Sequence, residues 1–476
     1  MLKLNKTYNK IKNSFKVVKD NKILTIISGL FIMSILVISS ATIANDAGNN
    51  NNINGVLFNS VPTPHKEVNT ISHLQANKGG FKLNLNPFEI QPFSDTSINP
   101  GDSIQNAINN ANENDTITLN SGVYTECNIT VNKTGLTIIA ATFGEVTVDA
   151  QGNGTVFSIT NSNVNLIGLN ITNGKTTTNY GGGVYNGGGS VVNCSIINNT
   201  AGYGGGGVYN VGGSVVNCSI INNTATSTGG AGGGVRNSGG SVINCSIINN
   251  RADDGGGVFI DSGGSVVNCS IINNTASIGG GVYIIYNGGS VVNCSIINNT
   301  ASIGGGVYNV GGSVVNCSII NNTANSDGGG VYIYNGGSVV NCSIINNRAD
   351  GGGGVFISSG SVVNCSIINN TANTANSGDG GGVYISGGSV VNCTIINNTA
   401  TSTGGAGGGV RNSGGSVINC SIINNRADGG GGVYLSSGGS VVNCSIINNT
   451  ATNNNGGGVY NSGGSVVNCS IINNTA

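Results

Sequence analysis

The strongest constraint on the fold of this chain is a unit of about two dozen residues that recurs twelve times between Tyr180 and Ala476. Its first complete copy, residues 181–201, reads GGGVYNGGGSVVNCSIINNTA. Each copy carries one cysteine, and consecutive cysteines lie 23 to 28 residues apart. A period of this length indicates a solenoid, in which each unit contacts only its neighbours. We therefore expect one elongated domain behind an N-terminal leader, although the length alone would suggest about three domains.

The unit has the chemistry of strands and turns. Its Val-Val-x-Cys-Ser-Ile-Ile segment is rich in β-branched residues, too short for a helix, and bounded by Gly and Asn turn signals. No proline follows Pro100. Because all units run in the same direction, their strands must stack in parallel, coil upon coil. The predicted fold is all-β, a parallel β-helix.

Differences between the copies separate outer from inner positions. The position of Tyr185 holds Tyr or Phe except at Arg236 and Arg411, and the position of Thr200 becomes arginine in three copies. These three are Arg251, Arg348 and Arg426. A column of arginines in a dry interior would be prohibitive, so both columns are predicted to face solvent.

Strand alternation assigns the remaining positions. Val184 is predicted to point inward. In the next strand the same rule predicts three inward side chains, Val192, Cys194 and Ile196. It predicts three outward side chains, Asn193, Ser195 and Ile197. At the following inner corner a polar side chain needs a partner of its own kind one coil above and below, which predicts an amide ladder through Asn199, Asn223, Asn250 and Asn274.

The charge composition excludes one class of partner. Residues 176–476 contain five Arg, seven Asp and no Lys, Glu, Pro or His. Such a body lacks the basic face that neutralises nucleic-acid phosphates, so no nucleic-acid partner is expected. Disorder is the alternative for a Gly- and Asn-rich chain, but the regular Val, Cys and Ile columns supply a core that a linker lacks.

The N-terminal segments have their own signals. Residues 1–22 hold seven lysines, and the stretch from there to residue 44 is apolar, uncharged and ends in small-x-small patterns. Residues 1–44 are therefore expected to form an export signal peptide or, uncleaved, a membrane anchor. Either one places the solenoid outside the cytoplasm, as an extracellular or cell-surface protein. Residues 45–97 have little periodicity and are interpreted as a linker.

A cap is predicted at the start of the solenoid, within residues 98–175. Ile104, Ala107, Ile108 and Ala111 lie at helical spacing, with Asp102 or Ser103 as the N-cap. A short helix here would close the open end of the coil stack. Less regular first coils follow up to residue 175, and the twelve regular repeats fill residues 176–476.

Several of these motifs resemble a known superfamily. The Ile-Gln-x-Ala-Ile helix, the Asp-Thr-Ile-x-Leu and Gly-x-Tyr steps and the Asn-x-x-Leu-x-Gly-Leu-x-Ile-Thr coil resemble right-handed parallel β-helix proteins of the pectate-lyase-like superfamily. The Gly-Gly-x-Val-Tyr and Cys-Ser-Ile-x-x-Asn-Thr-Ala units resemble repeats of polymorphic outer membrane proteins and archaeal adhesin-like surface proteins. Together these likenesses cover residues 98–476. They imply a right-handed, single-stranded β-helix with a short N-terminal capping helix, used in adhesion or surface display.

One departure concerns the C-terminus. Bacterial members of the resembled group end in a β-barrel translocator, whereas this chain stops at Ala476 directly after a complete repeat. We expect a truncated product or an end that pairs with another chain.

The repeat cysteines occur singly, one per coil, at the same inward position. Parallel neighbours place their Cβ vectors side by side, which suits the torsion of a disulfide poorly. We expect a buried ladder of free thiols that act as small apolar groups. Its members are Cys194, Cys218, Cys245, Cys269, Cys294, Cys317, Cys342, Cys365, Cys393, Cys420, Cys444 and Cys469. Cys127 precedes the repeats and does not belong to this ladder.

Metal and phosphate sites are not indicated by the repeats. They contain no Cys-x-x-Cys and no histidine, so no metal site and no cofactor are expected. The glycine runs are interpreted as turns, because no Gly-Lys-Ser/Thr follows them.

Catalysis on this fold would need carboxylates that converge on one face. The repeat aspartates are scattered, one or two per coil: Asp253, Asp254, Asp261, Asp327, Asp350, Asp379 and Asp428. The chain contains almost the same sequence twice, at residues 225–257 and 400–432, so a block of seven coils was duplicated. A chain that gains whole blocks cannot depend on one constellation inside them, and we therefore expect that the chain is not an enzyme.

N-glycosylation is the candidate modification. Every repeat contains Asn-Cys-Ser or Asn-Cys-Thr within the second strand, and nine contain Asn-Asn-Thr at a corner. The corner set is favoured: Asn198, Asn222, Asn273, Asn298, Asn321, Asn369, Asn397, Asn448 and Asn473. Asparagine also suits these turns structurally, and both interpretations remain open.

Three functional hypotheses follow. The first is an adhesin-like stalk of about 15 coils, on the order of 70 Å long, that attaches to glycans or proteins of other cells. Its surface column would be Tyr185, Tyr209, Phe259, Tyr283, Tyr308, Tyr332, Phe356, Tyr384, Tyr434 and Tyr460. The alternative is a carbohydrate-active β-helix protein, a polysaccharide lyase or hydrolase, with Glu126, Glu145 and Asp149 of the first coils as its site. A passive cell-envelope stalk is the third possibility.

Overall fold

The computed structural model describes residues 55–57, 72–77, 80–84, 95–285, 288–373, 379–401 and 403–476. The predicted export segment, residues 1–44, lies outside them. The chain separates into two compact units, residues 1–90 and 91–476. In the first unit, strands β1 (Gly55–Leu57), β2 (Ser72–Asn77) and β3 (Gly80–Asn84) form an antiparallel sheet inside the segment interpreted as a linker. Within the described residues, no helix is both long enough and apolar enough to cross a bilayer.

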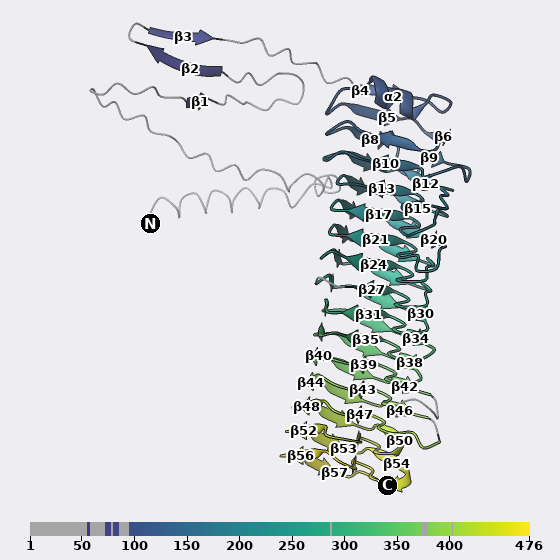
Figure 1. Ribbon diagram of the computed structural model, residues 1–476, viewed down its shortest axis with the longest axis vertical. Helices are drawn as coiled ribbons and strands as arrows, with labels where there is room; N and C mark the ends of the chain where they lie inside the picture. The colour runs from purple at the N-terminus through teal and green to yellow at the C-terminus, as the bar shows by residue number, and fades with distance from the viewer. Residues whose placement is uncertain are drawn as a thin grey trace, which may run out of the picture. The chain divides into compact units, whose positions relative to one another are not determined.

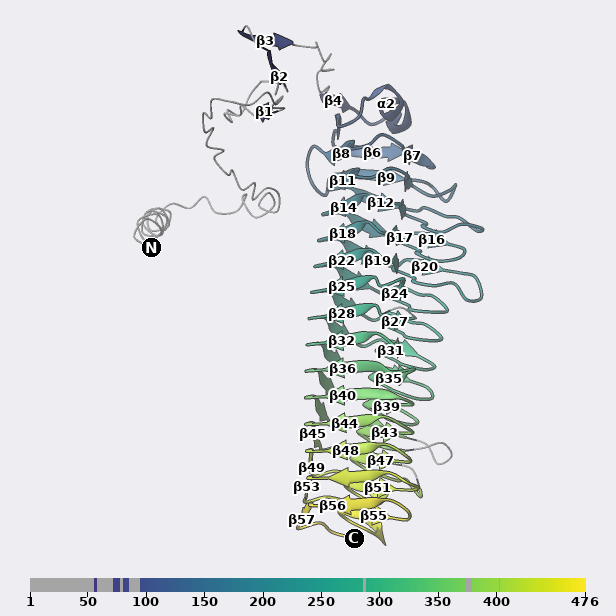
Figure 2. The same ribbon diagram turned by 60° about the vertical axis from the view of Figure 1, so that its left-hand side comes forward.

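The second unit is a parallel β-helix built from three long sheets of 14, 16 and 15 strands (Figures 1 and 2). Each of the twelve regular coils contributes one short strand to each sheet. In the first regular coil these are β13 (Val184–Asn186), β14 (Ser190–Val192) and β15 (Ser195–Ile197). The short strand β16 (Thr200–Ala201) completes this coil, and its counterparts form two small sheets of their own. The predicted all-β parallel solenoid is confirmed.

The 14-stranded sheet contains one strand from each of the twelve repeats and two strands from the first coils. Its strands are β7 (Ile129–Val131), β10 (Phe157–Ile159), β13, β17 (Val208–Val211), β21 (Val235–Ser238), β24 (Val258–Asp261), β27 (Val282–Ile284), β31 (Val307–Val310), β35 (Val331–Tyr334), β39 (Val355–Ile357), β43 (Val383–Ile385), β47 (Val410–Asn412), β51 (Val433–Leu435) and β55 (Val459–Asn461). The 16-stranded sheet runs from β4 (Asp95–Ile98) to β56 (Ser465–Val467), and the 15-stranded sheet from β6 (Gly122–Thr125) to β57 (Ser470–Ile472).

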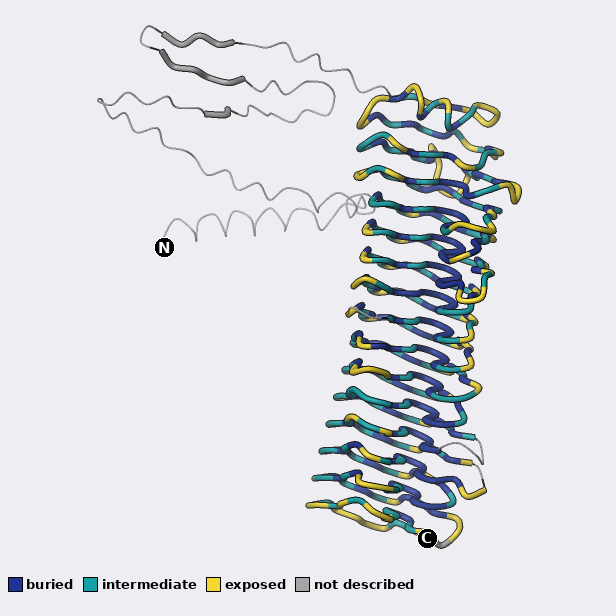
Figure 3. Tube along the Cα trace, viewed as in Figure 1, coloured by how far each residue is buried: buried dark blue, intermediate teal, exposed yellow. Residues whose placement is uncertain are grey.

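The core is a set of columns along the inside of the coils (Figure 3). In the first regular coil Val184, Val191, Cys194 and Ile196 are at most 2% exposed. Their counterparts stack directly above them, because neighbouring strands pair in register. Burying one such Val or Ile side chain contributes about 1.5–3 kcal/mol relative to leaving it in water.

The prediction that Val192 points inward is wrong. Asn193 has a φ of 53°, in the left-handed region, so the chain turns a corner between β14 and β15. Val191 faces the core before the corner and Cys194 faces it afterwards, whereas Val192 is only partly buried. Asn193 is exposed as expected, but it lies at this corner and not within a strand.

The predicted amide ladder is confirmed. Asn199 is fully buried, and its Nδ2 donates to Asn223 Oδ1 at 3.1 Å and to the carbonyl of Ile171 at 3.0 Å. A second amide ladder was not predicted: Asn186 Nδ2 donates to Asn210 Oδ1 at 2.8 Å in the 14-stranded sheet. These bonds satisfy polar groups that would otherwise destabilise a dry interior.

The glycine runs bring backbones into close approach. A Cβ on Gly182 would lie 2.5 Å from the carbonyl oxygens of both Thr200 and Gly206. No side chain fits here, which explains why glycine recurs immediately before the strand that each of the twelve repeats contributes to the 14-stranded sheet.

The predicted capping helix is α2 (Ile104–Asn110). Ser103 is its N-cap, with the Oγ accepting a hydrogen bond from the backbone N–H of Asn106. Ile104 and Ile108 are fully buried. The helix lies against β4 and β7.

Candidate functional site

The residues after the glycine turns form one continuous column on the outer face of the 14-stranded sheet. We call it the ring column: Tyr185, Tyr209, Arg236, Phe259, Tyr283, Tyr308, Tyr332, Phe356, Tyr384, Arg411, Tyr434 and Tyr460. Each pairs in register with the next. All are partly exposed except Phe259, which is 6% exposed. The inward valine that precedes each of them fixes the direction of the side chain.

The rings touch along most of the column, but their geometry changes. Between Phe259 and Tyr308 neighbouring rings are edge-to-face, with centroids 4.9 to 5.1 Å apart. From Tyr308 to Tyr384 the rings are stacked, with centroids 4.7 to 5.0 Å apart and planes within 13°. Both arrangements are favourable for aromatic pairs. The result is a row of six rings, Phe259 to Tyr384, without a break.

The two arginines of the ring column lie among the rings. The Arg236 guanidinium is 5.0 to 5.5 Å from the ring centroids of Tyr180, Tyr209 and Phe259. The Arg411 guanidinium lies 5.5 Å from Tyr384 and 5.8 Å from Tyr434. Cation–π attraction therefore keeps the column continuous where a ring is missing.

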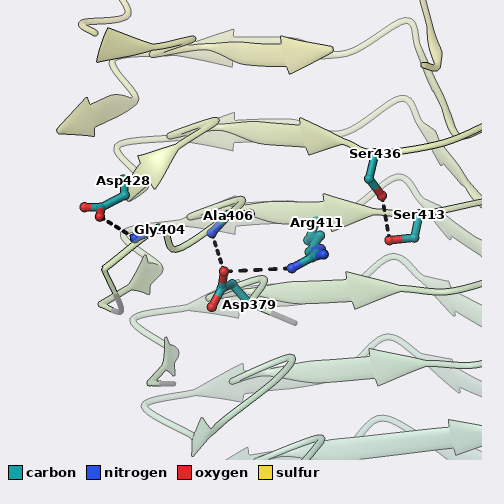
Figure 4. A network of polar contacts seen from close by, with 7 residues as sticks. All are labelled: Asp379, Gly404, Ala406, Arg411, Ser413, Asp428 and Ser436. Atoms are coloured by element: carbon teal, nitrogen blue, oxygen red, sulfur yellow. Dashed lines mark hydrogen bonds and ion pairs between the residues drawn. The ribbon is translucent and has the colours of Figure 1, made fainter. Parts of the chain in front are cut away.

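Each arginine also has a carboxylate partner. Arg236 Nη2 lies 3.0 Å from Asp261 Oδ2 in the next coil. Arg411 Nη1 lies 3.9 Å from Asp379 Oδ2, which also accepts a hydrogen bond from the backbone of Ala406 (Figure 4). The duplicated arginines thus have different counterions.

Sequence reasoning missed a second column beside the first. We call it the flank column, the residue before each glycine turn: Tyr180, Gly204, Ala231, Asp254, Ile278, Ile303, Asp327, Gly351, Asp379, Ala406, Gly429 and Asn455. Backbone bridges connect several successive members. The ring centroids of Tyr180 in the flank column and Tyr209 in the ring column are 4.7 Å apart, so the two columns lie side by side. The only signal in the sequence was the constant distance of five residues between their members.

Two aspartates of the flank column, Asp254 and Asp327, have raised pKa values. Burial, and then the charge of Asp253, raise the pKa of Asp254 to about 6. Burial also raises the pKa of Asp327, with a smaller contribution from Asp350. Burial, the neighbouring Tyr308 and the charge of Asp327 raise the pKa of Tyr332 to about 12. The charge of Asp327 in the flank column therefore acts on the hydroxyl of Tyr332 in the ring column.

The carboxylates proposed for the first coils are engaged elsewhere. The carboxylate of Glu126 accepts hydrogen bonds from the backbone N–H groups of Ile104 and Gln105, at the N-terminus of α2. Asp149 Oδ1 accepts from Asn173 Nδ2 at 2.9 Å, and Glu145 Oε2 accepts from Ser121 Oγ at 2.8 Å. These bonds position backbone and loops.

Two shallow hollows lie in the first coils. One of about 330 Å³ is lined by Thr147, Asn170, Ile171, Thr172, Ser195 and Ile197 and contains no carboxylate. The other, of about 380 Å³, includes Asp102 and Glu126. Among the described residues, no three His, Cys, Asp or Glu side chains gather as metal ligands would.

The twelve repeat cysteines lie in one inner column, and all of them and Cys127 are free thiols. The backbone N–H of Cys194 donates to Cys218 Sγ at 3.4 Å, and this contact recurs along the column up to Cys469. Hydrogen bonds with Cys194 and Cys245, followed by burial, raise the pKa of the Cys218 thiol well above its usual range.

The nine Asn-Asn-Thr asparagines, from Asn198 to Asn473, are all exposed. Each has a φ between 50° and 58°, so each lies at a left-handed corner that asparagine tolerates well. Their glycosylation stays a prediction.

A sequence family described as a right handed beta helix region matches residues 305–476. The fold is a right-handed parallel β-helix. No curated protein matches the chain.

Three solved structures illustrate the likeness. Pectate lyase Pel9A is 15% identical over 66% of this chain and 79% of its own, with a TM-score of 0.33. The PL6 family polysaccharide lyase Pedsa3628 from Pseudopedobacter saltans is 12% identical over 79% of this chain and 92% of its own, with a TM-score of 0.36. The GH87 α-1,3-glucanase catalytic unit from Streptomyces thermodiastaticus is 12% identical over 81% of this chain and 70% of its own, with a TM-score of 0.31.

These matches correct the expectation that the chain is not an enzyme. That expectation was drawn from the repetition of the coils, yet several of the matched structures are named as polysaccharide lyases and one as a glucanase. At these identities the likeness concerns the fold alone, and the site must be argued from this chain's own residues.

Proposed function

We propose that this chain is a carbohydrate-active β-helix protein that holds an extended polysaccharide lengthwise along the ring column. The observation that carries the proposal is the row of six rings from Phe259 to Tyr384, with neighbouring centroids 4.7 to 5.1 Å apart. A linear polysaccharide likewise presents one sugar ring after another along its length. Tyrosine offers it an apolar body and a hydroxyl at the tip, which suits the mixed polarity of a sugar.

The flank column supplies a candidate acid for bond cleavage. Glycoside hydrolysis needs a carboxyl group whose pKa is raised toward neutrality, so that a working fraction carries the proton even where most of the group is ionised. Asp254 lies beside the ring column, and burial and Asp253 raise its pKa to about 6. We propose Asp254 as that group, in place of Glu126, Glu145 and Asp149.

Surface attachment is the second candidate. It is favoured by the duplication of residues 225–257 as residues 400–432, since repeated weak sites bind a polymer or a cell more tightly than one site does. The lysine-rich and then apolar residues 1–44 support a place outside the cytoplasm, on the cell surface or beyond it. The partners would be glycans of the envelope or of other cells.

One assay separates these possibilities. The full chain is incubated with a panel of polysaccharides, and retention and the release of new sugar ends are measured in the same wells. We expect retention, weakened on the order of tenfold by Tyr332→Ala. Phe143→Ala, which removes a 54% exposed ring between β8 (Thr137–Ala140) and β9 (Val146–Asp149), serves as the control.

The outcomes are distinct. New sugar ends that disappear in Asp254→Asn would support cleavage at the flank column. Retention without release would support attachment. No retention of any polysaccharide, or equal loss in Tyr332→Ala and Phe143→Ala, would contradict the proposal.

A further inference from the structure

The charges around the ring column bear on which polysaccharide it accepts. The column itself contains two cations, Arg236 and Arg411. Arg236 donates to Asp261 from both Nε and Nη2, at 3.3 and 3.0 Å. Arg411 lies 3.9 Å from Asp379. Neither guanidinium is therefore available as an uncompensated positive charge for an anionic ligand.

The guanidinium groups are also shielded from the side. The side chains of Arg236 and Arg411 are 21% and 26% exposed. Each guanidinium also lies between two aromatic rings of the neighbouring coils, at 5.3 to 5.8 Å from their centroids. A binding surface for an acidic polymer would instead present exposed arginines or lysines.

The flank column adds negative charge. Asp254 and Asp327 are half-buried beside the row of six rings, and no ion pair is formed by either among the described residues. The ring and flank columns together contain two arginines and three aspartates, Asp254, Asp327 and Asp379, and Asp261 pairs with Arg236 from the end of β24. The three exposed arginines, Arg251, Arg348 and Arg426, belong to the column of Thr200, before the loop that leads to the flank column.

An anionic sugar on this surface would meet like charge. A carboxylate brought close to Asp254 or Asp327 would be repelled, and both aspartates already lie where burial disfavours charge. A neutral sugar would keep its contacts with the rings and hydroxyls without this penalty.

We infer that the ligand of the ring column is a neutral polysaccharide and that polyuronates are excluded. This inference rests on the proposed function and narrows its substrate class.

The test compares two kinds of probe on the full chain at neutral pH. The neutral probes are β-glucan, α-glucan, xylan and mannan, and the anionic probe is polygalacturonate, each at about 20 mM and about 300 mM NaCl. We expect at least one neutral probe to bind at least about tenfold tighter than polygalacturonate at low salt, with an affinity that changes little with salt.

A pair of variants locates the effect. Asp254→Asn combined with Asp327→Asn should raise the affinity for polygalacturonate at low salt several-fold, and the gain should vanish at high salt. Asp95→Asn, which removes an exposed carboxylate from β4 in another sheet, should leave both affinities unchanged.

The two possible failures are distinguishable. Polygalacturonate binding that equals or exceeds the neutral binding would overturn the inference and leave lengthwise polysaccharide binding intact. A polygalacturonate affinity that does not respond to the double variant would also overturn it. Binding of no probe at all would remove the proposed function, and the inference with it.

Discussion

The carboxylate of Asp261 accepts two hydrogen bonds from the guanidinium of Arg236, from Nη2 at 3.0 Å and from Nε at 3.3 Å. The partners lie on neighbouring strands of the 14-stranded sheet, and both are about four-fifths buried. This pair removes the first cation of the ring column from any role as an anion site.

Breaking that pair should change ligand preference. Asp261→Asn keeps the shape of the side chain but leaves Arg236 without a counterion, so the affinity for polygalacturonate at low salt should rise several-fold. Titration of the full chain at two salt concentrations measures the change. An affinity that stays at the wild-type value would mean that Arg236 does not face the ligand.

Asp254 should make stability depend on pH. Its folded pKa of about 6 lies above the ordinary value of 3.8, so the folded state binds more protons between these two values. Stability should therefore fall as the pH rises from about 4 to about 6, and the loss should persist above that range. Asp254→Asn removes this loss. Urea unfolding at about pH 4 and about pH 7 measures it: the variant should be more stable than wild type only at the higher pH, and an equal difference at both would contradict the assignment.

The buried amide ladder should be a main source of stability. Asn223 Nδ2 donates to Asn250 Oδ1 and to the carbonyl of Ile196, while its own Oδ1 accepts from Asn199. Asn223→Ala leaves these groups without partners and should cost about 2–5 kcal/mol locally. Hydrogen exchange of the adjacent coils is the measurement, because a solenoid need not unfold in one step.

The neighbouring residue gives the control for that change. Asn222 is exposed with a φ of 56°, a conformation that glycine adopts freely, so Asn222→Gly should cost no more than about 1 kcal/mol. Similar losses of protection in the two variants would show that the ladder bonds do not carry the stability.

The thiols should divide sharply by reactivity. Cys127 and Cys469 are partly exposed, whereas the eleven cysteines from Cys194 to Cys444 are buried. An alkylating reagent should modify the first two in the native protein and the others only after unfolding, as read by mass spectrometry. Rapid native modification of Cys294, in the middle of the stack, would contradict a closed core.

The sequence predicted those features that depend on strict repetition. The period of the cysteines indicated the solenoid, and the arginine substitutions at Arg236 and Arg411 identified an outer column. Asn199 was correctly assigned to an inner ladder, because a polar residue repeated at a corner must bond to its own copies.

The errors have physical causes. Val192 was assigned inward because alternation assumes a straight strand, and the left-handed Asn193 breaks the strand there. The flank column was missed because Asp254 and Asp327 alternate with Gly, Ala and Ile in the sequence, so nothing marked the position as a column. The flank column lies beside the rings because of the way the glycine turn folds back. Alternation within single strands carries no information about that turn.

The most direct test of lengthwise binding is to shorten the column. Ala225 and Ala400 are followed by the same sequence, so deleting residues 226–400 joins Ala225 to Thr401 without changing the local sequence, and it removes seven coils with the six-ring row. The affinity for a long neutral polysaccharide should fall on the order of tenfold but persist on the remaining rings, Tyr185, Tyr209, Tyr434 and Tyr460. An unchanged affinity, or a complete loss in a variant that still folds, would contradict binding along the ring column.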